Sequence, residues 1–129
     1  MSLINEQDNL LEPIRGSIFY EDKDTYACLA SFPIVPGHCV VVWKNDISDL
    51  HLLSKTNYEK LMETVEKVRN ALLETMNTDK VYLIYMDEIK HVHWHLIPRT
   101  QSETGFTLLE HKPKKLNDIS FAKILKKAL

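Results

Sequence analysis

Three of the six histidines of this 129-residue chain lie within five residues, in the segment His91-Val92-His93-Trp94-His95. Because side chains alternate across a strand, a strand here would place the three imidazoles on one face, about 6.5 to 7 Å apart in steps of two. The apolar residues between them would point into the opposite layer. Adjacent imidazoles repel one another once protonated and pack no better than valine. The row therefore indicates chemistry rather than structure, with His93 an exposed strand residue that can be replaced without loss of the fold.

Two kinds of chemistry use such a row. Histidines on a strand can bind zinc, but a stable site needs three or four convergent ligands, and no cysteine pair or His-Glu helix supplies the others. Alternatively, a neutral imidazole can attack an electrophilic phosphorus while its neighbours donate protons to phosphate oxygens and the leaving group. A row of histidines suits the second use better. His51 and His111 are isolated and receive no role.

The surrounding sequence predicts an α+β domain. β-branched and aromatic residues predict strands over residues 17–20, 25–32, 38–43, 80–85 and 91–98. The polar residues 21–24 join the first two strands as a hairpin. Pro33-Ile34-Val35-Pro36-Gly37 is a rigid turn, since two of its residues lack an amide donor. Residues 38–43 are apolar on both faces, which predicts a deeply buried central strand.

The clearest helix follows a polar connector over residues 45–53. Thr56, with Glu59 three residues later, has capping-box spacing and predicts its start. Apolar residues then recur at helical steps and predict one helix covering one face of the sheet: Tyr58, Leu61, Met62, Val65, Val68, Leu72 and Leu73. Residues 77–79 end it.

The sequence predicts less regular structure at the two ends of the chain. Residues 1–15 are expected to be a loosely ordered arm, and residues 112–129 a basic tail of the same single domain, spanning residues 1–129. A short helix is predicted from Asp118. Its apolar positions could dock on the domain or on a second copy: Phe121, Ile124, Leu125 and Ala128.

Composition argues against several function classes. Sixteen basic against eighteen acidic residues give a net charge of −2, which does not favour a nucleic-acid partner. Three glycines are too few for a Gly-rich dinucleotide loop or a P-loop. Two cysteines, both in apolar runs, indicate a reducing compartment. Without a signal-like segment or a long apolar run, we expect a cytoplasmic protein with no membrane partner.

The segment His91 to Ile97 resembles the His-φ-His-φ-His-φ-φ signature of the histidine triad (HIT) superfamily, which comprises nucleotide hydrolases and transferases. Pro36-Gly37-His38 is similar to the turn that brings a fourth histidine to the pocket in that superfamily. The resemblance covers about residues 17–99. It implies a five-stranded antiparallel sheet with one long helix and a short C-terminal helix. It also implies a homodimer and a two-step reaction through a covalent nucleotidyl-histidine.

Carried over by position, the resemblance makes His93 the nucleophile. His91 would orient His93 and contact phosphate, with a main-chain carbonyl holding the imidazole tautomer. His95 would lie near the leaving group, and His38 would be the fourth catalytic imidazole. The implied substrate is a small nucleotide, either a nucleoside phosphoramidate or a dinucleoside polyphosphate, and the chemistry uses no metal or other cofactor.

Several positions depart from the superfamily pattern. Ala30 stands where many members have an Asp or Asn that holds the ribose, so we name Ser31 and Arg99 as candidate substrate-binding residues. The turn before the row, residues 86–90, contains Asp87 and Glu88 in place of a Gly-rich loop. Residues 81–83 lack an asparagine common in the family. These departures keep two alternatives open, a catalytically weak nucleotide-binding module and a metal-binding protein that uses the same histidines.

Overall fold

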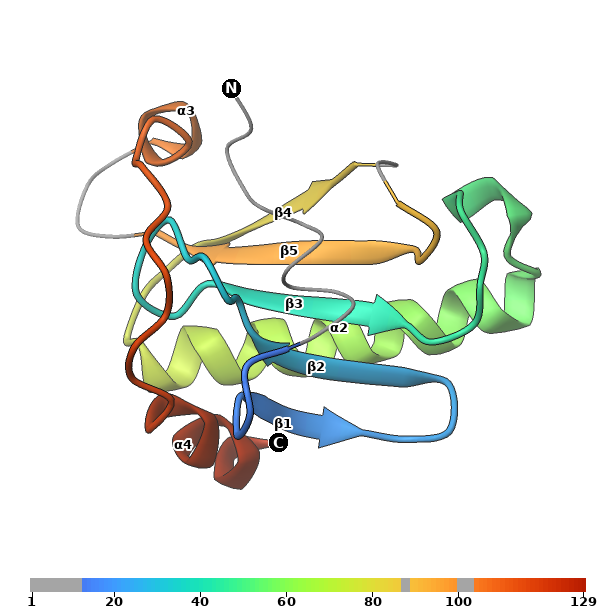
Figure 1. The fold of residues 1–129 in the computed structure, drawn as a ribbon, viewed down its shortest axis with the longest axis horizontal. Coiled ribbons are helices and arrows are strands. Elements are labelled where there is room, and N and C mark those ends of the chain that lie inside the picture. Colours follow the sequence, from blue (N-terminus) through green and yellow to red (C-terminus); the bar gives the residue numbers. More distant parts are fainter. Residues whose placement is uncertain (1–12, 87–88, 100–103) are drawn as a thin grey trace.

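The computed structural model describes residues 13–86, 89–99 and 104–129. Its centre is a five-stranded antiparallel sheet with strand order β1-β2-β3-β5-β4 (Figure 1). The strands are β1 (Ile18–Glu21), β2 (Thr25–Leu29), β3 (Cys39–Trp43), β4 (Val81–Tyr85) and β5 (His93–Pro98). The helices are η1 (Leu50–Leu52), α2 (Lys55–Thr75), α3 (Gly105–Leu108) and α4 (Phe121–Ala128). The predicted α+β architecture with a five-stranded antiparallel sheet is confirmed.

The central strand β3 has all five residues buried, as its continuous apolar sequence predicts. It pairs with β2 on one side and β5 on the other. Alternate residues Cys39, Val41 and Trp43 pack in the core beneath α2, while Val40 and Val42 face the other side. This second face carries the histidines.

Helix α2 begins before the predicted capping box. The side chain of Ser54 accepts a hydrogen bond from the amide of Asn57 at 3.1 Å, so Ser54, not Thr56, is the N-cap. A serine hydroxyl that reaches the third helical amide satisfies an otherwise unpaired donor, and this fixes the start at Lys55. The helix packs its buried residues on the sheet: Leu61, Thr64, Val65, Val68, Ala71 and Leu72. Tyr58 lies outside this buried face and is 39% exposed.

Strand β2 is shorter than predicted and ends at Leu29 rather than Phe32. Beyond it, the carbonyls of Ser31 and Pro33 accept hydrogen bonds from the amides of Leu116 (2.7 Å) and Lys114 (3.4 Å) in the C-terminal segment. We call residues 111–118 the strap. Figure 1 shows this segment running from α3 across the end of the sheet to α4. Beyond Leu29, Ser31 and Pro33 therefore form backbone hydrogen bonds with the strap.

The C-terminal helix begins at Phe121, not Asp118, whose carboxylate accepts a hydrogen bond from the amide of Ser120 at 2.9 Å. Leu125 is buried in the core shared with α2 and β1, as predicted, but Ile124 is 51% exposed and does not dock. The short helix α3 has no counterpart among the predicted elements. Within residues 13–86, 89–99 and 104–129, none of the helices is long and apolar enough to cross a membrane.

Candidate functional site

The histidine row lies on the face of the sheet opposite α2. Register pairs His93 with Val42 and His95 with Val40, and Val40 and Val42 share an apolar cluster with Cys28 and Ala30. The intervening Val92 and Leu96 belong to the core beneath α2. The predicted alternation is therefore confirmed for His93 and His95.

His91 does not belong to the strand, contrary to the predicted start of β5. The amide of Val92 donates to the carbonyl of Ile47 at 3.0 Å, and the carbonyl of Val92 accepts from the amide of Trp43 at 2.9 Å. The bond from Trp43 is still in register with the ladder, whereas the bond to Ile47 joins Val92 to the connector after β3, and β5 begins at His93. Nδ1 of His91 lies 3.3 Å from the carbonyl oxygen of Trp43 and 3.2 Å from that of Asn45.

The tautomer of His93 follows from its backbone partner. Nδ1 of His93 lies 2.9 Å from the carbonyl oxygen of His91. A carbonyl can only accept, so Nδ1 carries the proton, and in the neutral ring Nε2 then carries the lone pair. The expected main-chain contact to the middle histidine is present, and it leaves the lone pair of the neutral ring at Nε2.

The tautomer of His95 is set through His38. The backbone amide of Ile34 donates to Nδ1 of His38 at 3.2 Å. The neutral His38 ring therefore has its proton on Nε2, which lies 3.0 Å from Nδ1 of His95. His95 accepts at Nδ1 and so holds its own proton on Nε2. A chain of hydrogen bonds from Ile34 through His38 to His95, here called the relay, thus places an N–H donor beside the ring of His93, since the ring centroids of His93 and His95 are 5.2 Å apart.

Burial keeps the His38 ring of this relay neutral. His38 and His93 are 1% exposed, and His95 is fully buried. Burial, with a smaller contribution from His95, lowers the pKa of His38 well below its usual value of 6.5. The expectation that His93 is an exposed strand residue is wrong: the side chain is 1% exposed, on a strand that lies between β3 and β4.

The turn before β3 is rigid, as its prolines predict, and Gly37 allows its shape. Gly37 has φ of +88°, a conformation that side chains rarely adopt. A Cβ there would also lie 3.1 Å from side-chain atoms of Met76 and Pro98. The turn closes with the amide of His38 donating to the carbonyl of Val35 at 3.2 Å. Glycine at this position therefore allows the backbone conformation that directs the His38 side chain toward β5.

The two candidate substrate-binding residues lie at different places. Ser31 is buried beside Ala30, which is on the histidine face. Arg99 follows β5, and its guanidinium lies 3.9 Å from the carboxylate of Asp79. The side chain of Arg99 thus lies near Asp79, just before the start of β4. Asp87 and Glu88 lie outside the described residues.

Cavities reach both ends of the row. One, of about 230 Å³, is lined by His91 together with Ile18, Tyr26, Val42 and Lys44, among others. The second adjoins His38. Among the residues that the structure describes, no three His, Cys, Asp or Glu side chains converge in a way that could hold a metal ion.

Sequence reasoning missed the backbone groups that fix the rings. These are the amide of Ile34 and the carbonyls of Trp43 and Asn45. A backbone partner carries no residue-type signal, because every residue but proline offers the same amide and carbonyl. Only the rigid turn before His38 pointed to one of them.

The chain is similar to known proteins in sequence. The family model described as HIT domain matches residues 12–102. A bis(5'-nucleosyl)-tetraphosphatase (asymmetrical) from Schizosaccharomyces pombe is 24% identical over 118 residues, 87% of this chain and 65% of that protein. A bis(5'-adenosyl)-triphosphatase from Saccharomyces cerevisiae is 27% identical over 93 residues, 67% of this chain and 45% of that protein. The chain thus spans about half to two thirds of the length of these relatives.

The fold agrees with solved structures as well. A crystal structure of a Hit-like protein from Bartonella henselae superposes with a TM-score of 0.72 at 23% identity, covering 95% of this chain and 98% of that one. The family match, the histidine row and the sheet topology agree with one another. The chain therefore belongs to the HIT domain family.

Proposed function

We propose that this protein is a nucleotide hydrolase or nucleotidyl transferase that works through a covalent nucleotidyl-histidine on His93. The observation that carries the proposal is the hydrogen bond from Nδ1 of His93 to the carbonyl of His91, because it leaves Nε2 as the nucleophile. Relatives named as dinucleoside polyphosphate hydrolases support the reaction class.

In the first step, the lone pair of His93 Nε2 attacks the α-phosphorus of the substrate. The bond between phosphorus and the leaving nitrogen or oxygen breaks while the N–H at Nε2 of His95 donates a hydrogen bond to the leaving atom, and the leaving group takes a proton from solvent. His91, held by the carbonyls of Trp43 and Asn45, can direct its Nε2 side at the phosphate. The products are the protonated leaving group and a nucleotidyl group on His93.

In the second step, water attacks the same phosphorus, and the bond to His93 breaks. The proton of the water passes to solvent, and the ring of His93 leaves with its lone pair restored at Nε2, which returns the site to its starting protonation. Another nucleophile in place of water gives transfer instead of hydrolysis. The relay through His38 supports this cycle, because the hydrogen bond to His95 Nδ1 keeps the exchangeable proton at Nε2.

The substrate we propose is a nucleoside phosphoramidate or a dinucleoside polyphosphate. The cavity of about 230 Å³ at the His91 end of the row, lined by Tyr26, Val42 and Lys44 among others, offers a place for part of such a nucleotide. Ala30 offers no side-chain acceptor for a ribose hydroxyl. Ser31, buried beside Ala30, is the candidate that we propose for a substrate contact there. Arg99 stays a candidate only for a substrate that reaches the Asp79 end of β5.

We also propose a homodimer. β4 is an edge strand of the sheet, and on it Leu83 is 38% exposed. An exposed edge with apolar residues is a template for pairing with another chain. A second copy would cover it.

The test is turnover of adenosine 5'-phosphoramidate and diadenosine tetraphosphate by the wild type, His93→Ala and His93→Gln. Because His93 is buried, the glutamine variant keeps most of the volume and controls for loss of folding. The proposal requires turnover that survives a chelator and disappears in both variants. Binding without turnover in the wild type would favour a nucleotide-binding module, and loss with the chelator would favour a metal site; either outcome overturns the proposal.

A further inference from the structure

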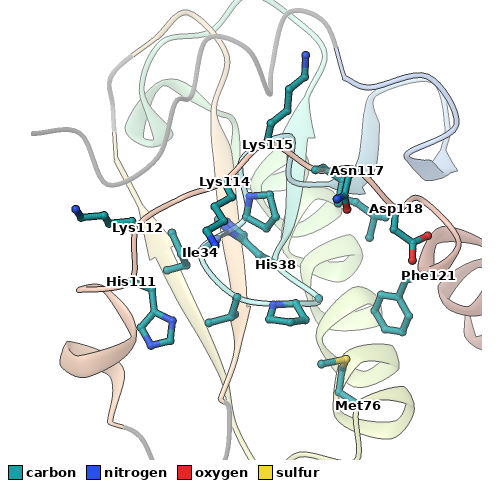
Figure 2. A pocket seen from close by; sticks show the side chains of 16 residues that line it. Ile34, His38, Met76, His111, Lys112, Lys114, Lys115, Asn117, Asp118 and Phe121 are labelled. Atoms are coloured by element: carbon teal, nitrogen blue, oxygen red, sulfur yellow. Dashed lines mark hydrogen bonds between the residues drawn. The ribbon is translucent and has the colours of Figure 1, made fainter.

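A second cavity lies behind the turn that holds His38, outside the histidine row. It has a volume of about 850 Å³ and is bounded by the strap and by residues 33–38. Met76 at the end of α2 and Phe121 at the start of α4 close its lower side (Figure 2). This volume lies within the range of pockets that take small organic ligands, about 300 to 1,000 Å³.

The wall of this cavity is apolar and held in place. Pro33, Val35, Met76 and Phe121 contribute to the lining. The strap is fixed by the backbone hydrogen bonds from Leu116 to Ser31 (2.7 Å) and from Lys114 to Pro33 (3.4 Å). The cavity is therefore formed before any ligand arrives, which lowers the entropy cost of binding.

The rim of the cavity is basic. Lys112, Lys114 and Lys115 are exposed and contribute to the lining, in a chain whose net charge is −2. In Figure 2, Lys114 extends toward Ile34 and His38, while Lys112 and Lys115 point outward. Asp118 is the acid among the described lining residues, and its carboxylate is engaged by the amide of Ser120. The rim thus attracts anions.

We propose that this cavity binds an organic anion with an apolar body, with the anionic group at Lys114 and the body against Met76 and Phe121. An ammonium beside an apolar wall fits a ligand that has both parts, because each part alone uses only half of the site. The proposal does not depend on the reaction of His93, since His91, His93 and His95 are not among the residues that line this cavity.

Methyl NMR of the full chain tests the location. The protein contains four methionines, and the Met76 methyl group lies in the cavity wall, whereas Met62 lines a separate groove on α2. Titration with octanoate should shift the Met76 signal saturably and leave Met62 nearly unchanged. Octanol at equal concentration should shift Met76 much less, and inorganic phosphate alone should not shift it.

Variants test the chemistry. Lys114→Met should weaken octanoate binding by about fivefold or more, because a charge-assisted contact is lost, while Lys126→Met on the exposed side of α4 should bind as the wild type does. His93→Ala should bind octanoate unchanged. An unmoved Met76 signal, equal shifts with octanol, or wild-type affinity in Lys114→Met would each overturn the proposal, as would binding that His93→Ala abolishes.

Discussion

Nε2 of His38 lies 3.0 Å from Nδ1 of His95, although 57 positions separate the two residues in the chain. The contact forms only when the Pro33–Gly37 turn and strand β5 have both taken their places. Because Nδ1 of His38 is held by the amide of Ile34, the contact fixes where His95 keeps its proton. We therefore propose that His38 is a positioning residue, which acts through His95 rather than through the substrate.

Replacing His38 should therefore affect the chemical step more than binding. We expect His38→Ala to lower kcat by about 100-fold, within the usual contribution of a positioned proton donor, with little change in KM. His38→Gln, whose amide can still donate to Nδ1 of His95, should lose less. Steady-state kinetics with adenosine 5'-phosphoramidate measure both. Equal loss in the two variants, or a change confined to KM, would argue against the relay.

Burial of His38 also gives stability a pH dependence. Its pKa lies well below 6.5 in the folded protein and near 6.5 in the unfolded chain. Below pH 6.5 the unfolded chain therefore binds more protons, so this contribution to stability is complete above pH 6.5 and falls as the pH drops toward the folded pKa. Urea unfolding at pH 7.5 and 5.5 should show this fall, and His38→Gln should reduce it. An unchanged difference in His38→Gln would exclude His38 as its source.

We expect Leu125 to contribute most of the stability that the packing of the C-terminal helix gives the domain. Leu125 is fully buried in the main core, whereas its neighbour Ile124 is 51% exposed. Leu125→Ala should reduce the free energy of unfolding by about 2 to 5 kcal/mol, and Ile124→Ala by less than about 0.5 kcal/mol. Urea denaturation compares them directly. Similar losses in both would mean that α4 packs differently.

The exposed edge of β4 leads to a prediction about assembly. If a second copy covers this edge, sedimentation equilibrium should give a dimer at micromolar concentration. Leu83→Lys places a charge on the edge and should shift the protein to monomer, with turnover per chain as the accompanying readout. If the wild type is a monomer, the proposed dimer is wrong, and the proposed chemistry of the histidine row is unaffected.

Much of this architecture could be predicted from the sequence, because its signals are local. The alternation around His93 and the continuous apolar run of β3 each fix a face or a burial state without knowledge of the rest of the chain. The predictions were wrong where hydrogen bonds to backbone groups distant in the sequence determine where a strand begins or ends. His91 leaves the strand because Val92 bonds to Ile47, and β2 ends early because Ser31 bonds to Leu116 of the strap.

The burial of His93 was missed for a related reason. An alternating pattern assigns residues to two faces but does not say how well each face is covered. Here the second face is also apolar, through Cys28, Ala30, Val40 and Val42 on the neighbouring strands. The tautomer of His95 could not be predicted, since it depends through His38 on the amide of Ile34, whereas the main-chain carbonyl beside His93 was expected from the family resemblance.

The most direct test is to identify the atom that carries the nucleotidyl group during turnover. Wild-type protein would be mixed with adenosine 5'-phosphoramidate, quenched rapidly, and analysed by intact mass and by peptide mapping under alkaline conditions. We predict one acid-labile nucleotidyl group on His93, absent in His93→Gln. Turnover with the group on His91 or His95, or with no adduct under any quench, would contradict the account.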